Sequence, residues 1–406
     1  MKRKSVSFHT TPNGLRIVHL SVPGASVGYF GVAVRVGSRD DGEGHHGLAH
    51  FVEHTIFKGT AKRRSWHIIN RMESVGGELN AFTTKEETVV YSAFPKGNLN
   101  RAAELISDLI TSSQFPEHEL EKEREVVADE IESYLDTPSE AVFDDFEEAM
   151  FAGSSLAHNI LGTRRALEGF SSELCQSYLK KWYTASNMVA FYAGCQGPER
   201  VMKTIEKYFG TLPSSKAVTH RAAPGAIAPF HIYKKIESHQ CHTIVGARVG
   251  SISSPERYST ALLTNILGGP GMNSLLNVAL RERRGLVYSV DASTGLFSDS
   301  GSLAIYYGCD PKDNEKCLSL VQETVKSVAD GYITSKRLEA AKKQYLGQLE
   351  IASENVENRI LAIARQALFL GYVQTGEELT DSIRSISAEH LAAAAKLELS
   401  SITLGS

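Results

Sequence analysis

Residues 47–60 read GLAHFVEHTIFKGT, with His50, Glu53 and His54 at the centre. A helical pattern begins there and predicts a helix over about 47–57. Residues four apart lie on one helical face about one turn apart, so His50 and His54 can present two imidazoles to a single ion. Glu53 is close enough in angle to reach a water molecule on that ion. The order H-x-x-E-H is the inverted form of a zinc-binding motif, and it predicts a zinc site in this helix.

A catalytic zinc normally needs a third protein ligand and keeps one position open for water. The charge-rich segment Glu117–Leu135 predicts a long helix with many carboxylates, most of which must face solvent. Glu123 and Glu130, seven residues apart, lie on one line beside its apolar stripe, so the spacing leaves both as candidate ligands. Zinc lowers the pKa of bound water to about 7, and Glu53 is the predicted general base that takes its proton.

The length of 406 residues exceeds what one hydrophobic core usually organises, so two domains are expected. Residues 214–229 are rich in turn formers and predict a linker between a zinc-binding domain, residues 1–213, and a second domain, residues 230–406. The stretch Tyr91–Asn98 also resembles Tyr307–Asn314, and each leads into a predicted helix. A duplicated domain would produce such a repeat.

Strands are predicted from runs of alternating or apolar residues. Residues 15–20 and 27–36 are expected to form two antiparallel strands joined by a turn. Further strands are expected at 78–84 and 87–94, after a helix over 65–74 that ends at a pair of glycines.

Composition excludes several classes of partner. The net charge is −4 and no long lysine or arginine run is present, so the sequence does not favour nucleic acid or an anionic membrane surface as a partner. No run approaches the roughly 18 apolar residues of a membrane span. The five cysteines are scattered and odd in number, as expected in a reducing compartment, and a cytoplasmic location is the expectation.

The stretch 47–60 resembles the M16, or pitrilysin, metallopeptidases, which include mitochondrial processing peptidase and insulin-degrading enzyme. In that family the third zinc ligand is a glutamate about 76 residues after the second histidine, which implies Glu130 here. The segment 123–130 resembles the family's ligand helix. A second family glutamate, seven residues earlier, falls on Glu123 and implies a role in orienting the site.

Two further stretches extend the resemblance. Residues 76–83 resemble the family's substrate-binding edge strand, which implies that Asn80 and Ala81 contact an extended peptide through backbone pairing. Residues 280–288 resemble a stretch carrying an arginine and a tyrosine seven residues apart. In relatives these two groups contact the substrate near the scissile carbonyl, which implies such a role for Arg281 and Tyr288.

The resemblance implies an α+β fold of two homologous α/β-roll domains, each a mainly antiparallel sheet covered by helices, with metal ligands in the first domain only. It implies a zinc endopeptidase that hydrolyses peptides or unfolded segments. Relatives with four such domains close around the substrate, so a homodimer is expected here, or a heterodimer with a related subunit. Two alternatives stay open: a non-catalytic peptide-binding or assembly subunit, and a zinc hydrolase or lyase that acts on a small molecule.

Overall fold

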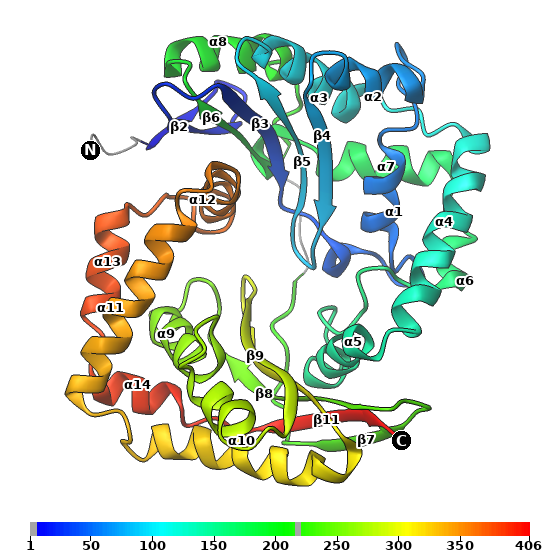
Figure 1. Ribbon diagram of the computed structural model, residues 1–406. Coiled ribbons are helices and arrows are strands. Elements are labelled where there is room, and N and C mark those ends of the chain that lie inside the picture. Colours follow the sequence, from blue (N-terminus) through cyan, green and yellow to red (C-terminus); the bar gives the residue numbers. More distant parts are fainter. Residues whose placement is uncertain (1–5, 216–220) are drawn as a thin grey trace. The chain divides into compact units, whose positions relative to one another are not determined.

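The computed structural model describes residues 6–215 and 221–406. The chain divides into two compact units, each built on one sheet with helices (Figure 1). Unit 1 comprises Met1–Ile131, His158–Arg221 and Ala352–Thr375, and unit 2 comprises Glu132–Ala157, Ala222–Ile351 and Gly376–Ser406. The predicted fold class, α+β with two mainly antiparallel sheets covered by helices, is confirmed.

The sheet of unit 1 has six strands in the order β1-β2-β6-β3-β5-β4. Only the β2–β6 pair is parallel. The strands are β1 (Val6–Thr10), β2 (Arg16–Ser21), β3 (Val27–Val34), β4 (Glu78–Thr83), β5 (Thr88–Pro95) and β6 (Met188–Gly194).

Both faces of this sheet are buried. Successive side chains of a strand point to opposite faces, so neighbouring residues enter different cores. On β3, Phe30 and Val32 join one apolar core, whereas Ala33 joins another. The first core is completed by several helices of unit 1, and the second by α12 alone among the helices. The helices of unit 1 are α1 (Leu48–Thr55), α2 (Ser65–Glu73), α3 (Leu99–Ser112), α6 (Arg164–Leu167), α7 (Ser172–Trp182), α8 (Pro198–Phe209) and α12 (Val356–Leu370), with most of α4 (Glu117–Leu135).

The sheet of unit 2 repeats this topology with five strands in the order β7-β11-β8-β10-β9. Here too only one pair is parallel, β7 with β11, which corresponds to β2 with β6 in unit 1, and the other pairs are antiparallel. The strands are β7 (His231–Lys235), β8 (Cys241–Val249), β9 (Val287–Leu296), β10 (Gly301–Cys309) and β11 (Ser400–Gly405). The similar stretches Tyr91–Asn98 and Tyr307–Asn314 end β5 and β10, which occupy equivalent places in the two sheets.

Unit 2 also buries both faces of its sheet. Neighbouring residues of β8 enter different cores, Val245 with α9 and α10, and Ile244 with α5. The helices are α5 (Pro138–Met150), α9 (Arg257–Gly268), α10 (Asn314–Ala329), α11 (Ser335–Ala352), α13 (Gly376–Arg384) and α14 (Ala388–Ala394), with a π-helical segment at Asn277–Glu282.

The two halves of the sequence exchange one helix each. Helix α12, from the C-terminal half, covers β2, β3 and β6 of unit 1. Helix α5, from the N-terminal half, covers β8 and β11 of unit 2. Each sheet therefore has one face covered by a helix that the linear domain division assigns to the other half.

One sequence-based expectation differs from the structure. The strands β2 and β3 were expected to be adjacent, but β6 lies between them and pairs with both. A boundary between the units falls at Arg221, inside the predicted linker 214–229, whose residues 216–220 lie outside the described part of the chain. No helix among the described residues is both long and apolar enough to cross a membrane.

Candidate metal centre

Helix α1 carries the H-x-x-E-H motif, and its N-terminus is held from outside the helix. Gly47 precedes it with a φ of 97°, and a side chain there would meet the carbonyl oxygen of Leu161 at 2.5 Å. The carboxylate of Asp41 accepts the backbone N–H of Gly47 at 2.8 Å and that of Ala49 at 3.0 Å. These bonds satisfy donors that a helix N-terminus leaves without partners.

Packing fixes which face of α1 points toward the motif's partners. Leu48, Phe51 and Val52 are buried in the main core of unit 1. His50 is also nearly buried, with 7% of its surface exposed. The hydrophobic stripe thus anchors the helix, and the motif residues project from the rest of its surface.

The structure brings His50, His54 and Glu130 together. Oε2 of Glu130 lies 3.7 Å from Nε2 of His50 and 3.5 Å from Nε2 of His54. One candidate donor atom from each residue lies within 4.8 Å of the other two. Across residues 6–215 and 221–406, no other group of three histidine, cysteine or acidic residues converges in this way.

This donor set fits zinc. Ligand distances of about 2.0–2.2 Å in a tetrahedral site place neighbouring donors roughly 3.3–3.6 Å apart. The separations of 3.5 and 3.7 Å need little adjustment to meet that geometry. Burial and the neighbouring His54 lower the pKa of His50 to about 3, so His50 is neutral at pH 7, as a metal ligand must be. Two imidazoles and one carboxylate leave a fourth position for water or substrate.

Glu123 lies behind His54 and outside the ligand group. Its Oε1 accepts the Nδ1–H of His54 at 3.0 Å, so the Nε2 of that ring faces Glu130. Lys58 also pairs with Glu123. Burial alone would raise the pKa of the Glu123 carboxyl, but the hydrogen bonds from His54 and Lys58 hold this pKa below its usual range. Glu123 is therefore an ionised acceptor that orients one imidazole.

Glu53 is not one of the three converging donors, although it lies between the two histidines in sequence. Burial raises its pKa, and the charge of Glu130 adds to this effect. His54 opposes the rise, as does a hydrogen bond from the side chain of Thr83 on β4. Glu53 is thus a carboxylate held near the donors but free of the ligand positions.

Asn80 and Ala81 lie on β4, the strand at the end of the six-stranded sheet. They pair with Tyr91 and Val90 of β5. Within unit 1, β4 also contacts α1, the helix that carries the motif (Figure 1). Among the described residues no strand pairs with the other edge of β4. An open strand edge of this kind can accept an extended peptide through its backbone groups.

Arg281 and Tyr288 belong to unit 2. Arg281 is exposed in the π-helical segment, and Tyr288 is exposed near the start of β9. The hydroxyl of Tyr288 donates to Oδ1 of Asp310 at 3.1 Å. Both side chains are accessible to a ligand on the surface of unit 2.

Sequence reasoning missed three residues that support the site: Asp41, Lys58 and Thr83. Lys58 lies beyond the end of α1 at Thr55, and its partner Glu123 is 65 residues later in the chain, so no local spacing marked it. Asp41 and Thr83 carried no signal either, because a loop and a strand bring them to α1 only in the folded chain.

Comparisons with known proteins identify the family of the chain. Residues 16–164 match the family model described as insulinase (peptidase family M16), and residues 169–345 match the model described as peptidase M16 inactive domain. The chain is 32% identical over 389 residues to an uncharacterized zinc protease, YmxG, of Bacillus subtilis, covering 95% of this chain and 94% of that protein.

Solved structures show the same fold at low identity. A protease from Helicobacter pylori superposes with a TM-score of 0.92 at 19% identity, covering 99% of this chain and 100% of the other. A peptidase M16 inactive domain from Pseudomonas fluorescens also gives 0.92, at 18% identity, covering 99% and 98%. The identity to YmxG over nearly the full length of both proteins shows the family: the chain belongs to the M16 family of zinc peptidases.

Proposed function

We propose that the chain is a zinc-dependent endopeptidase that hydrolyses peptides or unfolded segments. The observation that carries the proposal is the convergence of His50, His54 and Glu130, with Glu53 beside them and Glu123 behind His54. The printed names of relatives, which call them zinc proteases, support the same assignment.

Each residue has a defined part in the proposed reaction. A zinc ion held by the three donors would supply a Lewis acid and lower the pKa of a water molecule to about 7. Glu53 takes the proton of the attacking water and returns it to the leaving amine, while Thr83 holds its carboxylate in place. Glu123 keeps the ring of His54 oriented.

Substrate binding is proposed to use the backbone. An extended peptide pairs with the open edge of β4 at Asn80 and Ala81, a mode of binding that requires few particular side chains. Arg281 and Tyr288 are proposed to contact the substrate near the scissile carbonyl, where donors stabilise developing negative charge.

The proposed assembly is a homodimer, or a heterodimer with a related subunit, in which Arg281 and Tyr288 act on the metal centre of the partner.

The proposed location is the cytoplasm. All five cysteines are free thiols, which is in keeping with a reducing compartment.

The first test substitutes the base alone. Glu53→Gln should bind zinc as the natural chain does, because it removes no ligand, and should cleave a mixed peptide library roughly 10²–10⁴-fold more slowly. Metal analysis and mass spectrometry of the digest measure the two properties. The exposed Glu73→Gln is the matched control and should leave both unchanged. Cleavage at the natural rate by Glu53→Gln would refute its role as base.

One observation favours a second candidate, a non-catalytic peptide-binding or assembly subunit. Residues 169–345 match a model described as an inactive domain. This candidate predicts that the zinc-loaded chain binds peptides and returns them intact, with no difference between the natural chain and Glu53→Gln. Cleavage that a chelator abolishes and added zinc restores would exclude it.

A further inference from the structure

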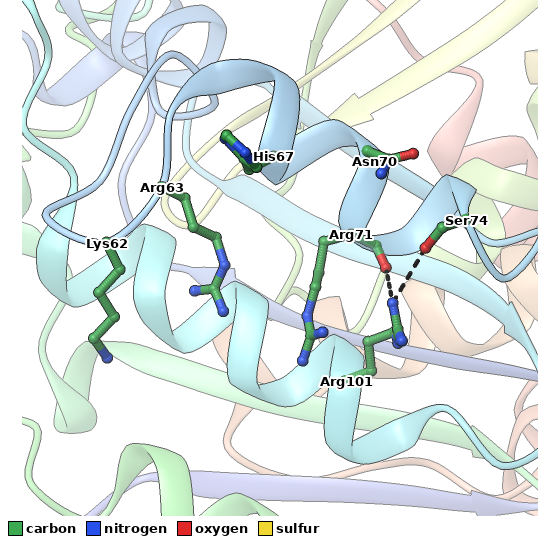
Figure 2. Close-up of a pocket in the computed structure, with 7 residues that line it drawn as sticks. All are labelled: Lys62, Arg63, His67, Asn70, Arg71, Ser74 and Arg101. Carbon is green, nitrogen blue, oxygen red and sulfur yellow. Dashed lines mark hydrogen bonds between the residues drawn. The ribbon is translucent and has the colours of Figure 1, made fainter.

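A hollow lined mainly by cationic side chains lies in unit 1 between α2 and α3, apart from the residues of the metal centre. Its volume is about 320 Å³. Four cationic side chains line it, namely Lys62, Arg63, Arg71 and Arg101, together with the polar side chains of His67, Asn70 and Ser74 (Figure 2). None of these residues belongs to the candidate metal centre.

Carboxylates of α3 fix two of the arginines. Arg63 donates to Glu104 at 2.7 Å and to Asp108 at 2.6 Å. Arg71 donates to the same Glu104 at 3.2 Å. Figure 2 shows the side chains of Arg63 and Arg71 directed side by side toward α3. Their guanidinium groups are therefore oriented before any ligand arrives, which lowers the entropy that a ligand must overcome.

Arg101 is held without a carboxylate. It donates to the carbonyl oxygen of Arg71 at 2.7 Å and to Oγ of Ser74 at 3.2 Å (Figure 2). In the described part of the chain no acidic side chain pairs with it. The Nε–H of Arg71 is buried and has no acceptor among the same residues. The hollow thus contains both an uncompensated cation and an unused donor.

The charge count identifies the kind of ligand. The Nζ atom of Lys62 is 3.9 Å from Oδ1 of Asp108, which is a long ion pair, and the side chain of Lys62 is 69% exposed. This side chain can therefore move toward a ligand. Four cations against two carboxylates leave an excess of two positive charges. A matching ligand carries at least two negative charges within a small volume. Planar guanidinium groups suit phosphate oxygens because two N–H groups can bond them at once.

We propose that this hollow, lined by Lys62, Arg63, Arg71 and Arg101, binds a compact phosphate anion carrying two or more charges. The site is independent of the proposed peptidase chemistry, since it shares no residue with the metal centre. The favoured ligand is a small molecule with linked phosphates, and inorganic pyrophosphate is the simplest probe of that chemistry.

The chain offers a matched control surface. A neighbouring hollow of about 410 Å³ is lined by Arg200, Lys203 and Lys207 with Glu199, and it has the same excess of positive charge. Charge alone would attract anions equally to both. Only the first hollow has several guanidinium groups that carboxylates hold in place. If the fixed guanidinium groups bind the anion, only substitutions in the first hollow should weaken binding. If net charge alone attracts it, substitutions in either hollow should weaken binding.

Calorimetric titration of the full chain with pyrophosphate at about 0.15 M salt tests the proposal, because this salt screens exposed charges beyond about 8 Å. Saturable binding of one pyrophosphate per chain is expected. Arg101→Gln and the exposed Lys62→Gln should each weaken it about tenfold, the effect of losing one charge-assisted hydrogen bond. Lys203→Gln should leave it unchanged.

Three outcomes would overturn the proposal. They are the absence of saturable binding, equal weakening by Lys203→Gln, and equally tight binding of citrate, whose charges are carboxylates. Pyrophosphate could also bind a metal, so His50→Ala provides a separate arm: binding must survive in this variant. Loss of binding there would place the anion at the metal centre, whereas failure of the peptidase assignment leaves the expected result unchanged.

Discussion

Glu123 contacts the metal centre only through the ring of His54, and its substitution therefore tests orientation apart from ligation. Glu123→Gln keeps the shape but removes the ionised acceptor from the Nδ1–H of His54, a bond of 3.0 Å. Loss of such a supporting partner typically lowers metal affinity about 10–100-fold. Competition with a zinc chelator measures this change. Glu125→Gln, exposed on the same helix, is the control, and equal affinities in the two variants would contradict the assigned role.

The distinction between Glu123 and Glu130 shows where sequence reasoning about the site ends. The H-x-x-E-H spacing placed His50 and His54 on one face, because that relation is local to a helix. The two glutamates were equivalent by spacing, since both lie on one line of α4. They differ in which nitrogen of His54 they meet, Nδ1 or Nε2, and that depends on how α4 packs against α1. Family resemblance, not periodicity, separated them.

Glu87 predicts a pH dependence unrelated to the metal centre. Burial raises the pKa of its carboxyl, Arg365 opposes the rise, and Oε2 has no hydrogen-bond partner among the described residues. A carboxyl whose pKa is raised by folding binds its proton more tightly in the folded state than in the unfolded state. Its contribution to stability is thus fully present below the unfolded value of about 4.3 and is lost as pH rises through the folded pKa.

The experiment compares the natural chain with Glu87→Gln, which cannot ionise. The free energy of unfolding of the natural chain should fall relative to the variant as pH rises from about 4 toward neutrality, by an amount on the order of 1 kcal/mol. Denaturant unfolding at several pH values measures the difference. Parallel stability curves for the two proteins would contradict the assignment of this carboxyl.

At the scale of elements, local patterns were reliable and long-range neighbours were not. The helix predicted over Glu117–Leu135 has those bounds in the structure, and the strands near 78–84 and 87–94 form β4 and β5. The expected adjacency of β2 and β3 was wrong because β6, more than 150 residues later, inserts between them. Alternation shows that a strand has a buried face, but it does not show which strand pairs with it.

The exchanged helix α12 gives a prediction about fragments. In a fragment of residues 1–213 the sheet face formed by Val18, Leu20 and Phe191 would lose its cover. Ile360, Ile363 and Leu368 of α12 bury against that face, each contributing roughly 1.5–3 kcal/mol. Arg16 also donates to the carbonyl oxygen of Ala367 at 2.7 Å. The fragment should aggregate or bind a hydrophobic dye strongly.

A peptide of residues 352–375 added to that fragment should restore solubility and reduce dye binding. The same peptide with Ile360→Asp and Leu368→Asp is the control and should fail, because charges cannot enter an apolar face unpaired. A fragment that is soluble and binds no dye without the peptide would show that α12 is dispensable for unit 1.

For the whole molecule, the two units share a strand order but not a chemistry. In unit 1, β3 is followed by α1 and its metal-binding motif. In unit 2 the equivalent strand β8 is followed by α9, Arg257–Gly268, which contains neither histidine nor carboxylate. The two sheets thus share a strand order, while α9 lacks the donors that α1 carries. The residues of unit 2 proposed to act in catalysis, Arg281 and Tyr288, are substrate contacts and not ligands.

This division of labour predicts complementation between two inactive variants. Glu53→Gln removes the base of unit 1, and Arg281→Ala removes a substrate contact of unit 2. Each should bind zinc yet lose most peptide cleavage when prepared alone.

If Arg281 of one subunit serves the centre of its partner, a mixed dimer has one intact site. Random exchange of subunits should then restore about a quarter of the natural activity, because half the dimers are mixed and half of their sites are complete. Gel filtration and cleavage assays of the mixture at several protein concentrations measure the assembly and the recovery together. If both residues act within a single chain, no mixing ratio can restore cleavage, and the proposed homodimeric site is refuted while the metal centre of unit 1 stands.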